Sequence, residues 1–214
     1  MRSVKVLEML NEGKIDELKT SLQDEIYSDS LKNKPNAKKR YAAMKKYFTY
    51  TNSSRECLQK PCKIEFEDKQ YTSFTNSWSM ALTTEDTGEI ELFDTETGNY
   101  PDVTRLLHFD GVKRKVDFSD IFAEAKSRGY RLNKKEVGPG FKYLMLYDGT
   151  YYKIGLLEAT YGIIDDGKPA MVYHPDGEKK PLTIQTSIGI CMIMPVYIGD
   201  KDDLDEHEIV EVEL

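Results

Sequence analysis

From residue 62 onward the sequence is divided into short apolar runs separated by turn signals, and this division limits the fold to one rich in strands. Residues 62–66 alternate apolar and polar side chains with a period of two, as a half-buried strand does. Asp148-Gly149 and Pro175-Asp176-Gly177 are turn signals between runs of strand length. Short turns join antiparallel neighbours, so we predict an α+β fold with antiparallel sheets and helices on one face.

Helical periodicity is concentrated before these strands. Residues 3–28 place apolar side chains at helical spacing, with a break at Gly13, and predict an N-terminal helical segment over 1–30. A third helix, with one apolar face, is predicted to begin after Asn36, which can cap it. The other predicted elements include helices over 116–128 and 157–164 and a weak strand over 90–93.

The charges of the chain are segregated, although the net charge of −7 taken alone argues against binding to nucleic acid. Between Ser30 and Arg55 there is no Asp or Glu, and this window covers the predicted third helix. Such a basic stretch indicates either contact with DNA phosphates or a solvated helix face that keeps the protein soluble. The candidate DNA-contacting residues are Lys32, Lys34, Lys38, Lys39, Arg40, Lys45 and Lys46.

The C-terminal residues 200–214 have the opposite composition, with Lys201 as their only cation. We expect this acidic tail to be a disordered, solubilising extension. The alternative hypothesis is that it folds back on the basic helix and competes with DNA, because the two segments have opposite charge.

Several classes of function are excluded by what the sequence lacks. No apolar run approaches the roughly 18 residues that a membrane span needs, and the N-terminus lacks the apolar region of a signal peptide. Cys57, Cys62 and Cys191 form no even framework, so we expect buried free thiols in a cytoplasmic protein. No nucleotide-binding loop, nucleophile elbow or metal-ligand spacing occurs, and we expect no enzymatic activity, no cofactor and no metal.

Three segments resemble, in the same order, parts of the bacterial DNA sliding clamps, the rings that tether a polymerase to duplex DNA. Residues 55–82 resemble a clamp hairpin followed by a turn, here Asn76-Ser77-Trp78-Ser79, and a final apolar strand. Residues 100–107 contain an aromatic-Pro-Asp sequence like the one that links clamp domains. Residues 190–198 resemble the closing strand of a clamp, which ends on Met-Pro.

This resemblance implies a clamp-like half over 31–110, a second half over 111–199 and the tail over 200–214. The chain has room for one or two of the three domains of a bacterial clamp subunit. Short clamp-like proteins of phages and mobile elements are therefore a closer comparison for it. The implied function is a non-enzymatic, DNA-associated accessory protein, with duplex DNA and a polymerase or other replication protein as partners and with self-association as a homo-oligomer. The alternative is a clamp-derived protein-interaction module that does not bind DNA.

The resemblance also implies a second site. In sliding clamps, a groove beside the closing strand receives short hydrophobic peptides from client proteins, and methionine suits such a groove because its flexible side chain adapts to different ligands. The alternative is that this strand belongs entirely to the core. The candidate peptide-binding residues are Leu156, Met194, Pro195 and Val196.

Overall fold

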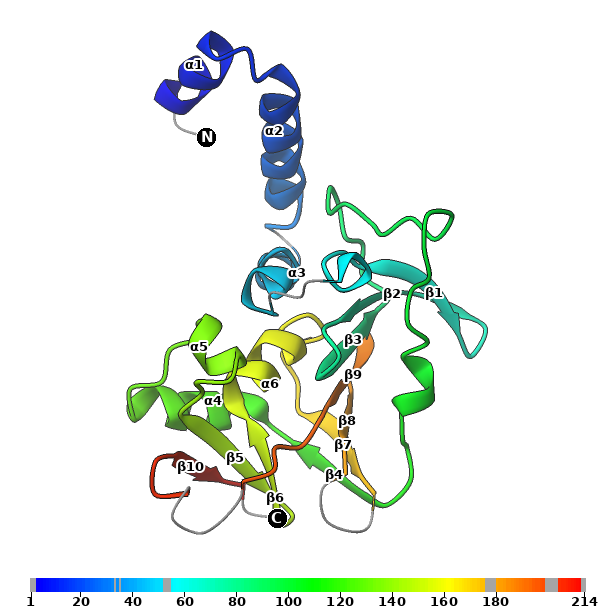
Figure 1. Ribbon diagram of the computed structural model, residues 1–214, viewed down its shortest axis with the longest axis vertical. Coiled ribbons are helices and arrows are strands. Elements are labelled where there is room, and N and C mark those ends of the chain that lie inside the picture. The colour runs from blue at the N-terminus through cyan, green and yellow to red at the C-terminus, as the bar shows by residue number, and fades with distance from the viewer. Residues whose placement is uncertain are drawn as a thin grey trace.

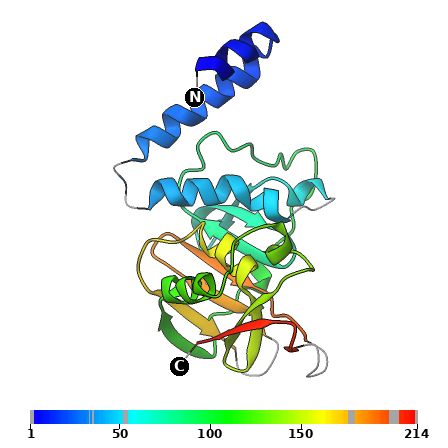
Figure 2. The ribbon, with the colours of Figure 1, turned by 90° about the vertical axis from the view of Figure 1, so that its left-hand side faces the viewer.

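The computed structural model describes residues 3–32, 34, 36–51, 55–175, 180–198 and 204–212. Its first two helices, α1 (Ser3–Asn11) and α2 (Ile15–Ser30), are separated at Gly13, where φ is +71°, a value that glycine adopts without strain. Together they project from the rest of the molecule, as Figures 1 and 2 show. The predicted N-terminal helical extension is confirmed, and we call these two helices the arm.

The basic segment forms α3 (Ala37–Thr51), and an antiparallel hairpin follows it. In this hairpin, β1 (Cys62–Phe66) and β2 (Lys69–Thr75) are joined by Glu67 and Asp68. Both linking residues have positive φ, which gives a two-residue turn the twist that the flanking strands require. The remaining elements of this part are the 3-10 helix η1 (Glu56–Leu58) and β3 (Ser79–Thr83), which pairs with β2.

The rest of the chain alternates between strands and short helices. Asp117 begins one of these helices, α4, by accepting a hydrogen bond from the backbone N–H of Ser119 at 3.0 Å. In chain order the elements are η2 (Thr104–Leu106), β4 (Val112–Val116), α4 (Phe118–Ser127), α5 (Lys134–Val137), β5 (Tyr143–Tyr147), β6 (Thr150–Lys153), α6 (Ile154–Tyr161), β7 (Ala170–His174), β8 (Leu182–Gln185), β9 (Gly189–Ile193) and β10 (Glu208–Glu211).

Seven strands form one antiparallel sheet in the order β1-β2-β3-β9-β8-β7-β4. The part of the chain up to β3 and the part from β4 onward meet in the middle of this sheet, where Ala81 of β3 lies opposite Cys191 of β9. A second sheet has the order β10-β5-β6, in which β10 runs parallel to β5. The expected α+β class with mainly antiparallel pairing is therefore confirmed.

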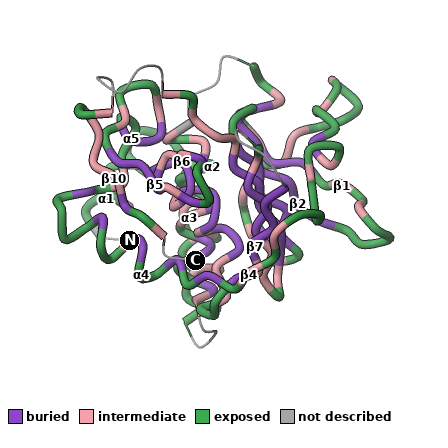
Figure 3. The backbone as a smooth tube through the Cα atoms, turned by 90° about the horizontal axis from the view of Figure 1, so that it is seen from below, coloured by how far each residue is buried: buried purple, intermediate pink, exposed green. Residues whose placement is uncertain are grey.

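The main core lies between the seven-stranded sheet and the helices. Tyr47 of α3, Leu157 of α6 and Phe74 of β2 are fully buried there, and Figure 3 shows the buried backbone concentrated in the sheet. Because side chains alternate along a strand, Met80 and Leu82 of β3 point to the opposite face. On that face they pack in a smaller apolar cluster beneath the segment that contains Val103 and Leu107.

Several expectations about individual segments are wrong. Residues 90–93 form no strand, and the helix predicted over 157–164 begins earlier, at Ile154. The acidic tail is not entirely an extension without structure, because residues 208–211 form β10 beside β5. Arg128, directly after α4, also donates to the carbonyl oxygen of Ile209 at 2.7 Å. The described part of the tail, 204–212, is thus fixed against β5 and α4 rather than against α3.

Two other sequence predictions can be compared with the structure. All three cysteines are free thiols; Cys62 and Cys191 are buried and Cys57 is half-buried. Within the described ranges, no helix combines the length and apolar character that crossing a membrane requires.

Candidate functional site

Helix α3 presents two rows of lysines to solvent. Its opposite side, which includes Met44 and Tyr47, packs into the core. Because seven residues make nearly two helical turns, lysines at this spacing lie in line, about 10 Å apart along the axis. The two rows are Lys38 with Lys45 and Lys39 with Lys46, all four exposed, and we call these residues the lysine face.

Carboxylates from other elements hold two of these lysines in ion pairs. Lys39 Nζ lies 2.7 Å from Asp165 Oδ2, just beyond α6. Lys45 Nζ pairs with Asp24 Oδ2 of α2. Among the residues that the structure describes, Lys38 and Lys46 belong to no ion pair. Half of the lysine face is therefore neutralised inside the molecule and half remains open to solvent.

Arg40 does not lie on this surface, which corrects the expected set of solvent-facing cations. Its side chain is buried, with Nη2 2.8 Å from Glu85 Oε2 and Nη1 donating to the carbonyl oxygen of Asp165 at 3.1 Å. Arg40 shares a helix side with Met44 and Tyr47, four and seven residues later, which are both in the core. Its guanidinium therefore fastens α3 to neighbouring loops.

Three lysines surround a recess between α2 and α3. The cavity has a volume of about 290 Å³ and is lined by Ser28 of α2 and by Lys38, Tyr41, Ala42, Lys45 and Lys46 of α3. Three cationic side chains in the lining of one recess favour an anion such as a phosphate group. The other two predicted contacts, Lys32 and Lys34, are exposed in the connector before α3, where Lys32 pairs with Asp29 at 2.9 Å.

A second recess lies on the opposite face of the seven-stranded sheet. Its volume of about 220 Å³ is below the roughly 300–1,000 Å³ of small-molecule sites, and it suits a single large side chain better. Three parts of the chain form it: η1 with the turn between β2 and β3, the segment around η2, and β9. We call it the apolar pocket, and its lining residues are Leu58, Thr75, Ser77, Ser79, Met80, Pro101, Asp102, Val103, Leu106 and Met192.

Hydrogen bonds fix the shape of this pocket. Asn76 Oδ1 accepts from the backbone N–H of Trp78 at 2.9 Å and of Ser79 at 2.8 Å, which holds the turn. The backbone N–H of Met194 donates to the carbonyl oxygen of Trp78 at 2.9 Å and ties the end of β9 to the same turn. Across the pocket, Asp102 Oδ1 accepts from Thr104 Oγ1 at 2.7 Å. The pocket is therefore formed before any ligand arrives.

Large apolar side chains are exposed around the pocket. Trp78, in the turn between two lining residues, is 65% exposed, and Leu106 of η2 is 45% exposed. Exposing an indole to water is unfavourable unless a partner covers it, and tryptophan is enriched at the centres of protein interfaces. Trp78 is also the only tryptophan of the chain.

The predicted peptide-binding residues are only partly brought to this pocket. Met194 is half-buried and packs against the cluster that contains Met80 and Met192. Pro195 and Val196 are also half-buried, and Val196 turns away to pair with Tyr151. The prediction that Leu156 lines a peptide-binding groove is wrong, because Leu156 lies in α6 with 3% exposure and belongs to the main core.

Sequence reasoning missed Met80, Val103 and Leu106, which line the pocket. The signal for them was present, because they lie in the first two of the three segments that carry the clamp resemblance. What was missing was the pairing of β3 with β9, which brings those segments to the closing strand.

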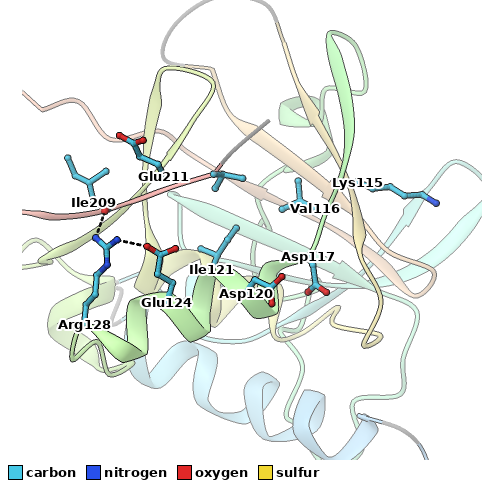
Figure 4. A pocket seen from close by; sticks show the side chains of 10 residues that line it. Lys115, Val116, Asp117, Asp120, Ile121, Glu124, Arg128, Ile209 and Glu211 are labelled. Atoms are coloured by element: carbon cyan, nitrogen blue, oxygen red, sulfur yellow. Dashed lines mark hydrogen bonds and ion pairs between the residues drawn. The ribbon is translucent and has the colours of Figure 1, made fainter.

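A further cavity, with a volume of about 800 Å³, lies between α4, β4 and β10 (Figure 4). Its charged side chains include both signs, and Arg128 pairs with Glu124 while it donates to the backbone of β10. No group of three His, Cys, Asp or Glu residues that could hold a metal ion occurs among the described residues. The contact that Arg128 makes here attaches β10 to the end of α4.

Comparisons with known proteins gave similarity at the level of structure. No family model matches the sequence, and no curated protein matches it. The structure is similar to DNA polymerase III subunit beta from Borrelia burgdorferi, with 14% identity, a TM-score of 0.49 and coverage of 75% of this chain and 62% of that one. It is also similar to the DNA polymerase sliding clamp from Bacillus subtilis, with 16% identity, a TM-score of 0.47 and coverage of 77% and 63%. The chain spans less than two thirds of the length of both clamps.

Proposed function

We propose that this protein is a non-enzymatic accessory protein that binds a short apolar segment of a partner protein in the apolar pocket. The observation that carries this proposal is the convergence of three distant segments on one preformed recess. The same three segments carry the sequence resemblance to sliding clamps, in which a groove beside the closing strand receives peptides from polymerases and other clients. The proposed partner is therefore a polymerase or another replication protein.

The chemistry of the pocket suits such a ligand. Met80, Met192 and Val103 provide an apolar floor, and methionine side chains can repack around different apolar residues. The volume fits one large side chain of the ligand, such as Leu, Met or Phe, rather than a folded surface. Leu106 and Trp78 are exposed beside it and can cover the flanking parts of the peptide.

Peptides selected from a displayed random library against the purified protein, and then synthesised, test this proposal. We expect the selected peptides to contain a large apolar residue and to change the fluorescence of Trp78 on binding, because Trp78 lies between two residues that line the pocket. Leu106→Glu should weaken binding at least tenfold, since it places a charge at the pocket. Leu22→Glu is the matched control, because Leu22 is 40% exposed on the arm and does not line the pocket.

A library that yields only peptides whose affinity is the same for the Leu106→Glu and Leu22→Glu variants would contradict the pocket as the binding site. Circular dichroism of both variants should match the parent protein, because both replaced leucines are at the surface and neither belongs to the buried core.

A second function is favoured by the recess between α2 and α3, where three lysines gather. We propose that the lysine face contacts the phosphates of duplex DNA without reading its sequence. Such contacts release counterions, so the logarithm of affinity falls with the logarithm of salt concentration with a slope of about −0.9 for each phosphate neutralised.

Neutralising Lys38 and Lys46 together tests this second function. The double variant Lys38→Gln with Lys46→Gln should reduce the magnitude of the salt slope for duplex binding by about 1.8. Lys113→Gln with Lys115→Gln removes the same charge from β4, and it should leave the slope almost unchanged. Equal slopes for the two double variants would contradict the lysine face as the contact surface.

A further inference from the structure

Helix α2 of the arm lies beside the row of the lysine face that is formed by Lys38 and Lys45. Asp24 of α2 pairs with Lys45 through Oδ2, and its Oδ1 accepts a hydrogen bond from the hydroxyl of Tyr41 at 2.5 Å. The ring of Tyr27 packs edge-on against that of Tyr41, with centroids 4.8 Å apart. The end of α2 is thus held on α3 by one carboxylate and one aromatic contact.

The contacts described above between α2 and α3 come from Asp24 and Tyr27, in the C-terminal half of α2. Figure 2 shows α2 rising away from α3 toward α1. The open side of this angle is a cleft of about 630 Å³, bounded by Asp16 and Glu17 on α2 and by Ile90 on the body. Displacing α2 from Lys45 therefore breaks the contacts of Asp24 and Tyr27 with α3, together with the hydrogen bond from the Tyr27 hydroxyl to the carbonyl oxygen of Asp86 at 3.1 Å.

The carboxylate of Asp24 stands where an external anion would bind. Lys45 lines the recess between α2 and α3 together with Lys38 and Lys46, and Asp24 neutralises Lys45 at its edge. Burial alone would raise the pKa of Asp24, but hydrogen bonds from Lys45 and Tyr41 outweigh that effect and the pKa is lowered. Asp24 is therefore ionised at neutral pH.

We propose that Asp24 is an internal competitor of phosphate, so that the arm lowers the affinity of the lysine face for nucleic acid until α2 is displaced from Lys45. This inference rests on the second function proposed above. The segment that shields the basic helix is then α2 and not the acidic tail, because the described part of the tail lies on α4 and β5.

Replacement of the Asp24 carboxylate by a DNA phosphate at Lys45 is energetically reasonable. The side chains of Lys45 and Asp24 are 44% and 26% exposed, and ion pairs that water reaches are weak. A DNA phosphate that takes the place of Asp24 also releases a condensed counterion from the duplex. The shield is thus strong enough to compete with weak ligands and weak enough to yield to a polyanion.

The test is duplex DNA binding by the full chain carrying Asp24→Asn, measured by fluorescence anisotropy between 50 and 200 mM salt. The asparagine keeps an oxygen that can accept from the Tyr41 hydroxyl, and it removes the negative charge that pairs with Lys45. We expect the salt slope to steepen by about 0.9, so that the gain in affinity is about three to four times larger at 50 mM than at 200 mM salt. Glu17→Gln is the matched control, because it removes the same charge from α2 two turns earlier.

The possible results separate this inference from the function on which it rests. If Asp24→Asn and Glu17→Gln increase affinity equally, the effect is one of net charge and the inference is overturned. If Asp24→Asn has no effect while neutralising Lys38 and Lys46 still weakens binding, the lysine face stands and the shield does not. If neither the parent nor Asp24→Asn binds duplex DNA, both proposals fail.

Discussion

At the scale of single residues, Ser79 joins the two helices of the core to the turn that bounds the apolar pocket. Its Oγ accepts from Thr160 Oγ1 of α6 at 2.8 Å and lies 3.0 Å from the hydroxyl of Tyr47 of α3. Burial raises the pKa of Tyr47, so its hydroxyl stays protonated and needs a partner. Ser79→Ala should lower the free energy of unfolding by about 1–3 kcal/mol in urea titrations.

The matched control for this change is Ser127→Ala. Ser127 is exposed and donates only to the carbonyl oxygen of Glu124 at 2.7 Å, so its loss should cost less than about 0.5 kcal/mol. Equal losses for the two alanine variants would show that the buried network around Ser79 contributes nothing beyond an ordinary surface hydroxyl.

Asp24 makes a second residue-level prediction, about pH. A carboxyl group with a lowered pKa in the folded protein stabilises the fold above its unfolded pKa, and this contribution is lost as pH falls through the lower folded value. At neutral pH the parent protein should be more stable than Asp24→Asn. The difference in free energy of unfolding, followed by urea titration, should shrink as pH falls below about 4. A difference that stays constant or grows toward acid would contradict the contact between α2 and α3.

At the scale of elements, the pairing of β3 with β9 holds together the part of the chain up to β3 and the part from β4 onward. Gly189 begins β9 with its backbone close to β3 and to Ile164: a Cβ there would lie 2.3 Å from the carbonyl oxygen of Leu82 and 2.5 Å from Cγ2 of Ile164. Gly189→Ala should therefore lower the free energy of unfolding by about 1–3 kcal/mol or more, measured by urea titration. Gly98→Ala, which meets only the end of the Phe93 ring in a loop, should cost much less.

The elements that sequence reasoning predicted correctly are those that local patterns define. Gly13 marks the break between α1 and α2, and the apolar spacing after Asn36 defines α3. Burial of Arg40 was also readable, because Arg40, Met44 and Tyr47 are spaced so as to share a helix side. Counting cations along the chain, rather than around the helix, hid this placement.

Other features depend on contacts between distant segments, which local patterns do not contain. β10 has only four residues, two of them Glu, and it forms because β5 offers a free edge and Arg128 binds the backbone of Ile209. The apolar pocket likewise exists only because β3 pairs with β9. Leu156 was misplaced for the same reason, since its burial results from packing of α6 against the sheet.

At the scale of the whole molecule, the two proposed sites lie on opposite faces of the seven-stranded sheet. The lysine face belongs to α3 on the helical face, whereas the apolar pocket lies over Met80 and Met192 on the other. A partner peptide and a polyanion therefore do not compete for the same surface. This arrangement suits an accessory protein that holds one macromolecule near another.

The most direct test of partner binding in the apolar pocket uses the eight methionines of the chain as probes. In a sample labelled with ¹³C at the methionine methyl groups, a selected peptide should shift the signals of Met80, Met192 and Met194, which lie at or beside the pocket. The signals of Met44 and Met145, which are buried in the main core, should stay in place. Shifts confined to Met44, Met145 or the other methionines, or saturable binding that moves none of the three pocket signals, would contradict the account.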